Sequence, residues 1–161
     1  MSFHPDMTRK APAGPAALCA GAILALACMT AQAAVYNPPI LLSQGIEYMS
    51  GGIGSEEAEL MRTVEPRWSA VFEFAVKDGQ GAAFAADVLL TVRDAQGRVV
   101  LDHVRASGPY LVARLDPGKY SAEAVLGGAA IVREITVGGA GTSTRNVFEW
   151  PQGTDTKSAR S

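Results

Sequence analysis

Cysteine and histidine are scarce in this sequence, and their positions limit its chemistry. Both cysteines, Cys19 and Cys28, fall within the first 33 residues, and of the two histidines only His103 lies beyond that point. A chain that has no cysteine after residue 33 forms no disulfide in that part. It also offers no thiolate there for a metal site or for nucleophilic catalysis.

Long hydrophobic runs are missing too. The apolar stretch from Ala16 to Met29 is too short for a transmembrane helix, and the basic pair Arg9 and Lys10 precedes it. Ala31-Gln32-Ala33 follows, which is the small-x-small pattern that signal peptidases cut. We therefore predict a signal peptide over residues 1–33, cleavage after Ala33, and a periplasmic or secreted bacterial protein.

The cysteine in "ALAC" raises a second possibility, a lipid anchor. A bacterial lipoprotein signal usually has leucine three positions before its cysteine, where this chain has Ala25. We therefore expect Cys28 to belong to the apolar run of the signal peptide and to be removed with it.

An excess of positive charge is absent as well. Removal of residues 1–33 lowers Lys plus Arg from 14 to 12 and Asp plus Glu from 16 to 15, which leaves a net charge of −3. This balance argues against a nucleic-acid partner. The remaining 128 of the 161 residues are enough for one hydrophobic core.

Helical periodicity is missing from residue 67 onward, where apolar and polar residues alternate. In "WSAVFEFAVK", Phe72, Phe74 and Val76 alternate with Glu73 and Lys77. Period two with aromatic and β-branched residues is typical of half-buried strands. Turn sequences rich in Gly, Asp and Pro separate seven such segments. The segments are 68–77, 87–93, 98–104, 110–115, 119–126, 130–137 and 144–150.

Seven short strands favour an all-β fold, a sandwich over residues 67–150. The same alternation predicts which side chains fill the space between its two sheets. The predicted core residues are Phe72, Phe74, Val88, Leu90, Leu115, Tyr120 and Phe148. After Trp150 the chain is polar and lacks apolar anchors, so residues 151–161 are predicted to be a disordered tail.

Residues 34–66 follow a different pattern and are predicted to be an N-terminal appendage. Its glycine-rich turn leads into a short helix that Ser55 caps, with Leu60, Met61 and Val64 at helical spacing and Pro66 at the end. We expect the strands from Trp68 to Trp150 to close a core without this appendage.

The run "DVLLTVRDAQGRVVLDHVRASGPYLVARLDPGKYSAEAVLGGAAIVREITV" resembles the carboxypeptidase-regulatory-like, or prealbumin-like, β-sandwich family. With "YMSGGIGSEE" before it and "VFEWP" after it, the chain also resembles small exported proteobacterial proteins that contain this domain. The resemblance implies a seven-stranded Greek-key sandwich and no particular chemistry. It also implies that Tyr120, after the "DPG" corner, turns its ring inward while its hydroxyl reaches nearby backbone.

Catalytic chemistry is not visible in the residues. Purine-degrading hydrolases with a prealbumin-like fold use several histidines and a C-terminal Tyr-Arg-Gly-Ser, whereas this chain has only His103 after residue 33 and ends "KSARS". No Gly-x-Ser-x-Gly elbow is present. His103 follows Asp102 in a strand, where neighbours point to opposite faces, so we do not expect the two to pair. We predict no enzymatic activity, no cofactor and no metal site.

Some sandwiches of this fold form a Lys–Asn isopeptide bond between their first and last strands. Lys77 and Asn146 lie in roughly those strands. Alternation places Lys77 on the face opposite Phe74, whereas Asn146 shares a face with Phe148, so we do not expect this bond.

The stretch "YMSGGIGSEEAELM" needs its own explanation. It is not a phosphate loop, because no lysine follows the last glycine and Glu56 and Glu57 would repel a phosphate. Acidic residues beside apolar ones favour a contact surface for a protein partner, although the apolar residues of the helix would serve equally as a structural lid. The candidate contact residues are Tyr48, Met49, Gly51, Gly52, Gly54, Glu56, Glu57, Leu60 and Met61.

Three functions remain open at this point. The first is an exported, non-enzymatic module that binds a protein or another component of the cell envelope. The second is an accessory carbohydrate-binding module, for which Trp68 and Trp150 are the aromatic candidates. The third, with least support, is a small periplasmic hydrolase.

Overall fold

The computed structural model describes residues 37–154 of the chain, which belong to one compact unit. The predicted signal peptide, its cleavage site and residues 155–161 of the predicted tail lie outside the described residues. Residues 151–154 of that tail are not disordered: they form a turn in which Thr154 is buried and its N–H donates to the Pro151 carbonyl at 3.3 Å. The elements are β1 (Leu41–Ser43), β2 (Ile46–Gly51), α1 (Ser55–Val64), the 3₁₀ helix η1 (Glu65–Arg67), β3 (Ala70–Asp78), β4 (Gly81–Phe84), β5 (Val88–Asp94), β6 (Val99–Ala106), β7 (Tyr110–Ala113), β8 (Gly118–Leu126), β9 (Ala129–Val137) and β10 (Thr144–Trp150).

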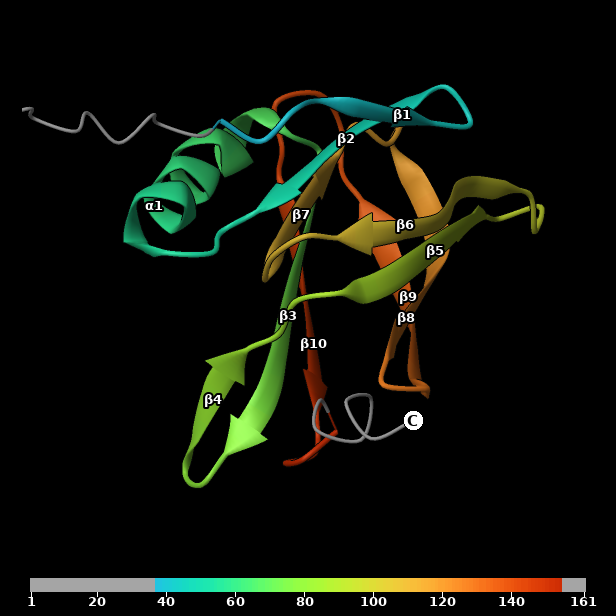
Figure 1. Cartoon of the computed structure of the whole chain (residues 1–161). Helices are drawn as coiled ribbons and strands as arrows, with labels where there is room; N and C mark the ends of the chain where they lie inside the picture. Colours follow the sequence, from blue (N-terminus) through green and yellow to red (C-terminus); the bar gives the residue numbers. More distant parts are fainter. Residues whose placement is uncertain (1–36, 155–161) are drawn as a thin grey trace, which may run out of the picture. The chain divides into compact units, whose positions relative to one another are not determined.

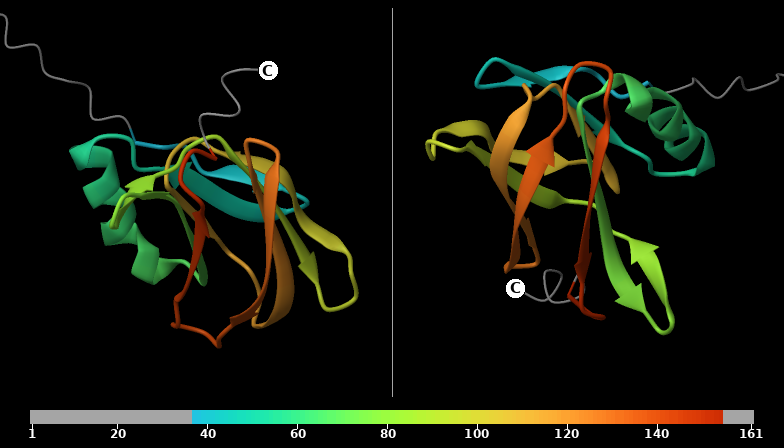
Figure 2. Two further views of the ribbon diagram at one scale, coloured as in Figure 1. Left: turned by 90° about the horizontal axis from the view of Figure 1, so that it is seen from below. Right: turned by 180° about the vertical axis from the view of Figure 1, so that it is seen from behind.

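The strands form two sheets (Figure 1, Figure 2). The larger sheet has the order β1-β2-β7-β3-β10, with β4 added to β3, and the smaller one has the order β6-β5-β8-β9. β3 and β10 run parallel to each other, whereas the other paired strands are antiparallel. Helix α1 lies on the outer side of the larger sheet, next to β2 and β7 (Figure 1).

The core lies between the two sheets, where side chains of the same parity along each strand meet. All seven predicted core residues are buried in this inner cluster, which confirms the alternation. Phe74 contacts Phe148 and Trp150, with ring centroids 5.9 and 6.4 Å apart. The Trp150 indole N–H donates to the Ala129 carbonyl, 2.9 Å away, so its polar atom is satisfied although the ring is buried.

The all-β prediction holds, but the described residues contain ten strands and not seven. The seven predicted segments correspond to β3 and β5 to β10. β4 was missed because "GAAF" shows no alternation of apolar and polar residues, and all four of its residues are exposed. β1 was missed because it has three residues. β2 was missed because its glycine end suggested a turn.

The boundary predicted at residue 66 does not separate an appendage from the sandwich. β2 pairs with β7 inside the larger sheet, from Tyr48 opposite Ala113 to Gly51 opposite Tyr110. A second apolar cluster lies where α1 covers the outer face of that sheet, with Met61 fully buried at its centre. This outer cluster consists of Met49, Ala58, Met61, Trp68, Val71, Tyr110 and Val112. Residues 37–66 are therefore part of the folded sandwich.

The start of α1 also differs from the prediction. Ser55 is the first helical residue and not the cap, and Gly54 precedes the helix with φ 86° and without any side-chain cap. The Glu57 carboxylate accepts a hydrogen bond from the Gly52 N–H at 3.0 Å and so anchors the first turn to the end of β2. The predicted end is confirmed, since α1 stops at Val64 and Pro66 lies in η1.

The two predicted corners behave as expected. The Tyr120 hydroxyl donates to the Asp116 carbonyl at 2.8 Å while the ring is buried. Burial and then the negative charges of Asp116 and Asp94 raise the pKa of Tyr120.

At the other corner the Asp94 carboxylate accepts hydrogen bonds from the backbone N–H groups of Gln96 and Arg98 at 2.9 Å each. Desolvation is the largest single influence on the Asp94 carboxylate and acts to raise its pKa. The hydrogen bonds from the backbone and side chain of Arg98 and from Gln96, with the charge of Arg98, together outweigh it and lower the pKa of Asp94.

Candidate functional site

The predicted contact residues do not share one exposed surface. Met49 and Met61 are 7% and 0% exposed because both belong to the outer cluster. Gly51 and Gly52 are buried as well. The remaining ones are half-buried (Tyr48, Glu57 and Leu60) or exposed (Gly54 and Glu56). A partner could therefore not contact all of these residues in the folded chain.

The glycines at the end of β2 serve contacts within the chain. A Cβ atom on Gly52 would lie 2.5 Å from the Tyr110 ring, and Gly52 has φ 104°. A Cβ atom on Gly51 would collide with the Glu57 carboxylate. Gly52 therefore lets the backbone pass against Tyr110, and both glycines make room for the link between β2 and α1.

An apolar groove opens beside α1, at the margin of the outer cluster. It has a volume of about 270 Å³ and lies between the helix, the segment that leads into β1, and the ends of β2 and β7. It includes two of the predicted contact residues, Met49 and Leu60. Its lining residues are Asn37, Pro38, Ile40, Met49, Leu60, Val64, Arg67, Trp68 and Arg114.

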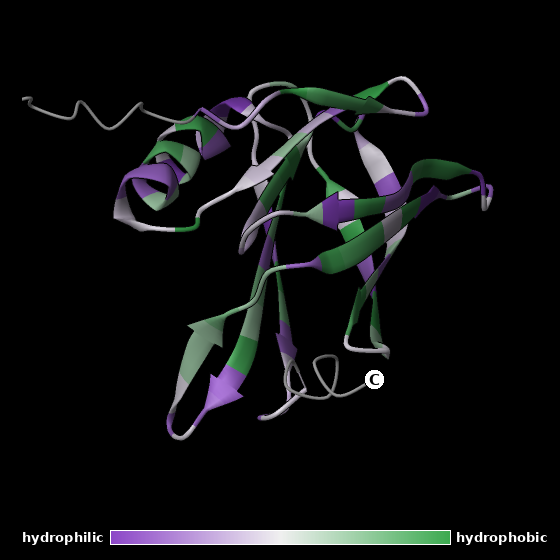
Figure 3. Cartoon of the chain, in the orientation of Figure 1, coloured by the Kyte–Doolittle hydropathy of each residue, from purple (hydrophilic) through white to green (hydrophobic). Residues whose placement is uncertain are grey.

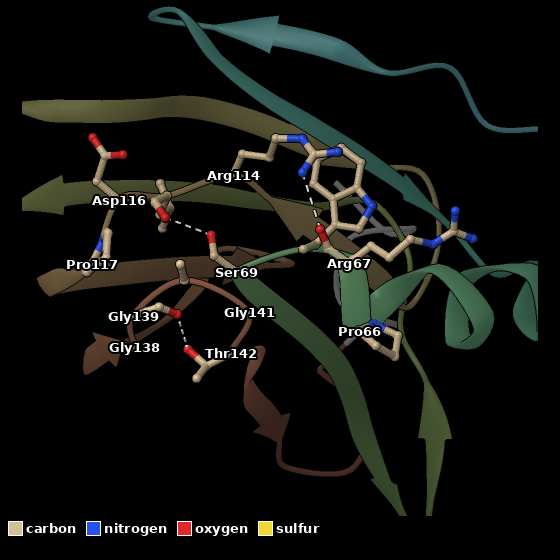
Figure 4. Close-up of a pocket in the computed structure, with 13 residues that line it drawn as sticks. Pro66, Arg67, Ser69, Arg114, Asp116, Pro117, Gly138, Gly139, Gly141 and Thr142 are labelled. Carbon is tan, nitrogen blue, oxygen red and sulfur yellow. Dashed lines mark hydrogen bonds between the residues drawn. The ribbon is translucent and has the colours of Figure 1, made fainter.

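Arg114 forms one rim of the apolar groove and is held by several contacts. Its guanidinium lies over the Trp68 ring, 4.4 Å from the centroid, which is a cation–π geometry. Its Nε donates to the Glu47 carboxylate at 2.8 Å, and its Nη1 donates to the Arg67 carbonyl at 3.2 Å (Figure 4). Trp68 is thereby covered by Arg114 and is only 4% exposed.

A polar groove of about 340 Å³ lies on the other side of the same Trp68 and Arg114 pair. Figure 4 shows Asp116 and the glycine loop Gly138–Thr142 on this side, with the Arg67 side chain extending away from them. The Ser69 hydroxyl donates to the Leu115 carbonyl at 2.7 Å, and Thr142 donates to Gly139 at 2.6 Å. These hydroxyls are engaged within the chain, so neither resembles an activated nucleophile.

Arg67, Trp68 and Arg114 line both grooves, so the two grooves meet at the Trp68 and Arg114 pair. Sequence reasoning missed both arginines. Arg67 and Arg114 are 47 residues apart and lie at the ends of different elements. No local pattern could have indicated that they would meet.

The expectation that Asp102 and His103 would point apart was wrong. Leu90 pairs with Val104 and Val92 with Leu101, so Asp102 and His103 stand together opposite Thr91 in a β-bulge. His103 has φ 44°, and its Nδ1 lies 2.5 Å from the Asp102 carboxylate. Both side chains are at least half exposed, and no nucleophile contacts the imidazole among the described residues.

A charged cluster ties η1 to the outer face of β3 and β10. Arg145 donates to the Glu65 carboxylate and, at 2.6 Å, to that of Glu73. The hydrogen bond to Glu65 raises the pKa of Arg145; partial burial opposes this, and the charges of Glu65, Glu73 and Tyr110 add to it. The second Glu65 oxygen is buried and has no hydrogen-bond partner within residues 37–154. Since the cluster links three elements of the fold, we regard it as structural.

Lys77 and Asn146, the two residues considered for an isopeptide bond, have different partners in the structure. Lys77 forms an ion pair with Glu149 at 3.6 Å, near the far end of β10. Asn146 stands opposite Phe72 in the parallel pairing and donates to the Val71 carbonyl at 3.3 Å.

Metal ligands do not gather in the part of the chain that the structure describes: no three His, Cys, Asp or Glu side chains are placed to hold an ion. None of the helices within residues 37–154 is long and apolar enough to span a membrane. In comparisons with known proteins, no family model and no curated protein matches this chain.

Proposed function

We propose that this chain is an exported, non-enzymatic module that binds another protein of the cell envelope through the apolar groove beside α1. The groove is the observation that supports this proposal. Pockets that bind ligands are concave and mainly apolar, with a few placed polar groups. This groove has that character, with two arginines on its rim.

Exposed apolar side chains lie next to the apolar groove. Ile40 lines the groove and is 56% exposed, and Leu42 in β1 is 71% exposed. Figure 3 shows β1 as a hydrophobic strip at the edge of the larger sheet. Exposed apolar residues that adjoin an apolar groove favour a protein contact.

The carbohydrate alternative has less support. Modules that bind glycans present exposed aromatic rings, whereas Trp68 and Trp150 are 4% and 1% exposed. Among the aromatic residues within 37–154, Phe84 on β4 is the one that is mostly exposed, and it lines neither groove: its ring packs against that of Tyr110, with centroids 5.6 Å apart. We therefore do not propose glycan binding.

The relationship to the carboxypeptidase-regulatory-like sandwiches, with their Greek-key path, belongs to the same proposal. It is supported by the parallel pairing of the first and last predicted sandwich strands, β3 and β10. Export is supported by the signal-peptide pattern before Ala34.

Site-directed photo-crosslinking in intact cells tests the function. A photoreactive amino acid replaces Leu60 in one variant and Val132 in a control variant. Leu60 lines the groove, whereas Val132 is an equally apolar residue, 59% exposed, on β9 of the other sheet. We expect a discrete adduct with one protein from position 60 and none from position 132. Absence of an adduct at position 60, or the same adducts at both positions, would contradict the proposal.

A further inference from the structure

The charged residues that line the apolar groove are both arginines. Its nine lining residues include Arg67 and Arg114 and no carboxylate. Glu47 pairs with Arg114 at 2.8 Å, so Arg67 is the lining cation that has no acidic partner among the described residues. Such a rim attracts an anionic group to a mainly apolar site.

The two arginines are not equivalent. Arg114 is held by Glu47, by the Arg67 carbonyl and by Trp68, and its Nη2 has no hydrogen bond within residues 37–154. The Arg67 guanidinium makes no hydrogen bond or ion pair with any described residue. Arg67 thus offers an uncompensated charge beside a fixed neighbour, and a carboxylate suits the planar donor fork of a guanidinium.

The size of the groove limits what enters it. About 270 Å³ is below the range of roughly 300–1,000 Å³ that is typical of pockets for drug-sized ligands. The volume suits one or two apolar side chains better than a long acyl chain. A peptide with such a side chain in the groove and an acidic residue next to it could place a carboxylate near Arg67 on the rim.

The polar groove offers a path for the rest of such a peptide. Asp116 lines the polar groove and not the apolar one, so a carboxylate is disfavoured there. The rest of the peptide would cross the Trp68 and Arg114 pair and run along the glycine loop, where Gly139 and Gly141 are exposed and leave the backbone accessible.

We propose that the apolar groove recognises an extended acidic segment of the partner protein: an apolar side chain enters the groove, and a neighbouring carboxylate binds the uncompensated Arg67. This inference rests on the proposed function and specifies the chemistry of the partner.

Fluorescence anisotropy tests it, using the chain from Ala34 and three labelled decapeptides. In the first peptide leucine and aspartate alternate; in the second lysine replaces aspartate; in the third serine replaces leucine. We expect the first peptide to bind at least tenfold more tightly than either of the others, since both the charge and the apolar side chain contribute. We also expect its affinity to fall with added salt.

Two matched pairs of variants locate the binding. Arg67→Gln should weaken the first peptide about tenfold, as expected for loss of one charge-assisted contact. Arg105→Gln removes an exposed arginine from β6, where its pair with Asp87 is loose at 3.4 Å, and should leave binding unchanged. Leu60→Ala should weaken binding and Val132→Ala should not. Thermal unfolding shows whether each variant is folded.

Several results would overturn the inference. Equal binding of the aspartate and lysine peptides would show that the groove does not prefer an acidic peptide. An equal loss of affinity in Arg67→Gln and Arg105→Gln would show that Arg67 is not the binding residue. Phosphatidylglycerol vesicles that bind with the same dependence on Arg67 would point to a lipid surface instead. If position 60 crosslinks to a protein in cells while the peptides show no charge preference, the chemistry proposed here fails and the proposed function stands. If position 60 forms no adduct and no peptide binds, both fail.

Discussion

The two apolar clusters of this protein are built in different ways. The inner cluster lies between two sheets, and alternating residues of both close it completely; Phe72, Phe74 and Phe148 are all 0% exposed. The outer cluster lies between one sheet and one helix of ten residues. A single short helix covers only part of a six-stranded sheet, so Leu60 and Val64 at its border remain half-buried.

The difference explains where a ligand finds room. A closed core packs to the density of a crystal and leaves no space for a ligand. The border of a partly covered face leaves apolar side chains beside polar ones, and the apolar groove opens at that border. The inner cluster therefore supplies stability, and the margin of the outer cluster supplies the candidate site.

Deletion of residues 34–65 is the most severe test of this comparison. The deletion removes β1, β2 and α1 and uncovers Trp68, Val71 and Val112. We expect the remaining chain to lose its cooperative thermal transition, measured by circular dichroism, because the outer cluster cannot form without Met49 and Met61. A transition that stays within a few degrees of that of the intact chain would show that the inner cluster suffices alone.

Truncation of one large side chain in each cluster compares them directly. Phe74→Ala should lower the free energy of unfolding by about 3–5 kcal/mol, as large-to-small changes in closed cores do. Met61→Ala should cost less, about 2–3 kcal/mol, because a single short helix packed on one sheet can shift toward the space that the side chain leaves. Urea unfolding measures both. Equal losses would mean that the outer cluster is as closed as the inner one.

Substitution of the glycine that contacts the outer cluster should lower the free energy of unfolding by a smaller amount. Gly52→Ala should destabilise by about 1–3 kcal/mol, because the new methyl group meets the Tyr110 ring and the residue has positive φ. Gly45→Ala is the control: it also has positive φ, at 82°, but no atom lies within 4 Å of the new Cβ. The difference between the two variants isolates the steric part. If the two losses match, Tyr110 moves aside freely.

Substitution of Tyr120, at the border of the inner cluster, should change the free energy of unfolding least. Tyr120→Phe removes the hydrogen bond to Asp116 and should cost about 1 kcal/mol. Because the pKa of Tyr120 is raised, its contribution to stability is complete below about pH 10 and is lost as pH rises through its pKa in the folded state. The variant should therefore lose stability less steeply above pH 10. The same alkaline slope in both proteins would exclude this role for Tyr120.

The inner half of the fold could be predicted because its pattern is local. Alternation along segments such as "WSAVFEFAVK" identifies which side chains share a face, and every predicted core residue is buried. The same local reasoning does not work for the predicted contact residues. Tyr48, Met49 and Gly51 belong to a strand whose partner, β7, begins at Tyr110, and nothing in "YMSGG" indicates that pairing.

The sequence by itself determined seven of the ten described strands, the corners and the inner core, since a period of two residues and the turn chemistry of Gly, Pro and Asp act over a few positions. Tertiary structure alone decided that α1 covers one side of the larger sheet, that Asp102 and His103 meet in a bulge, and that Arg67 and Arg114 flank one groove. Each of these depends on which distant strands pair and in which register. Pairing over such distances is settled by the packing of the whole chain, and not by the residues near any one position.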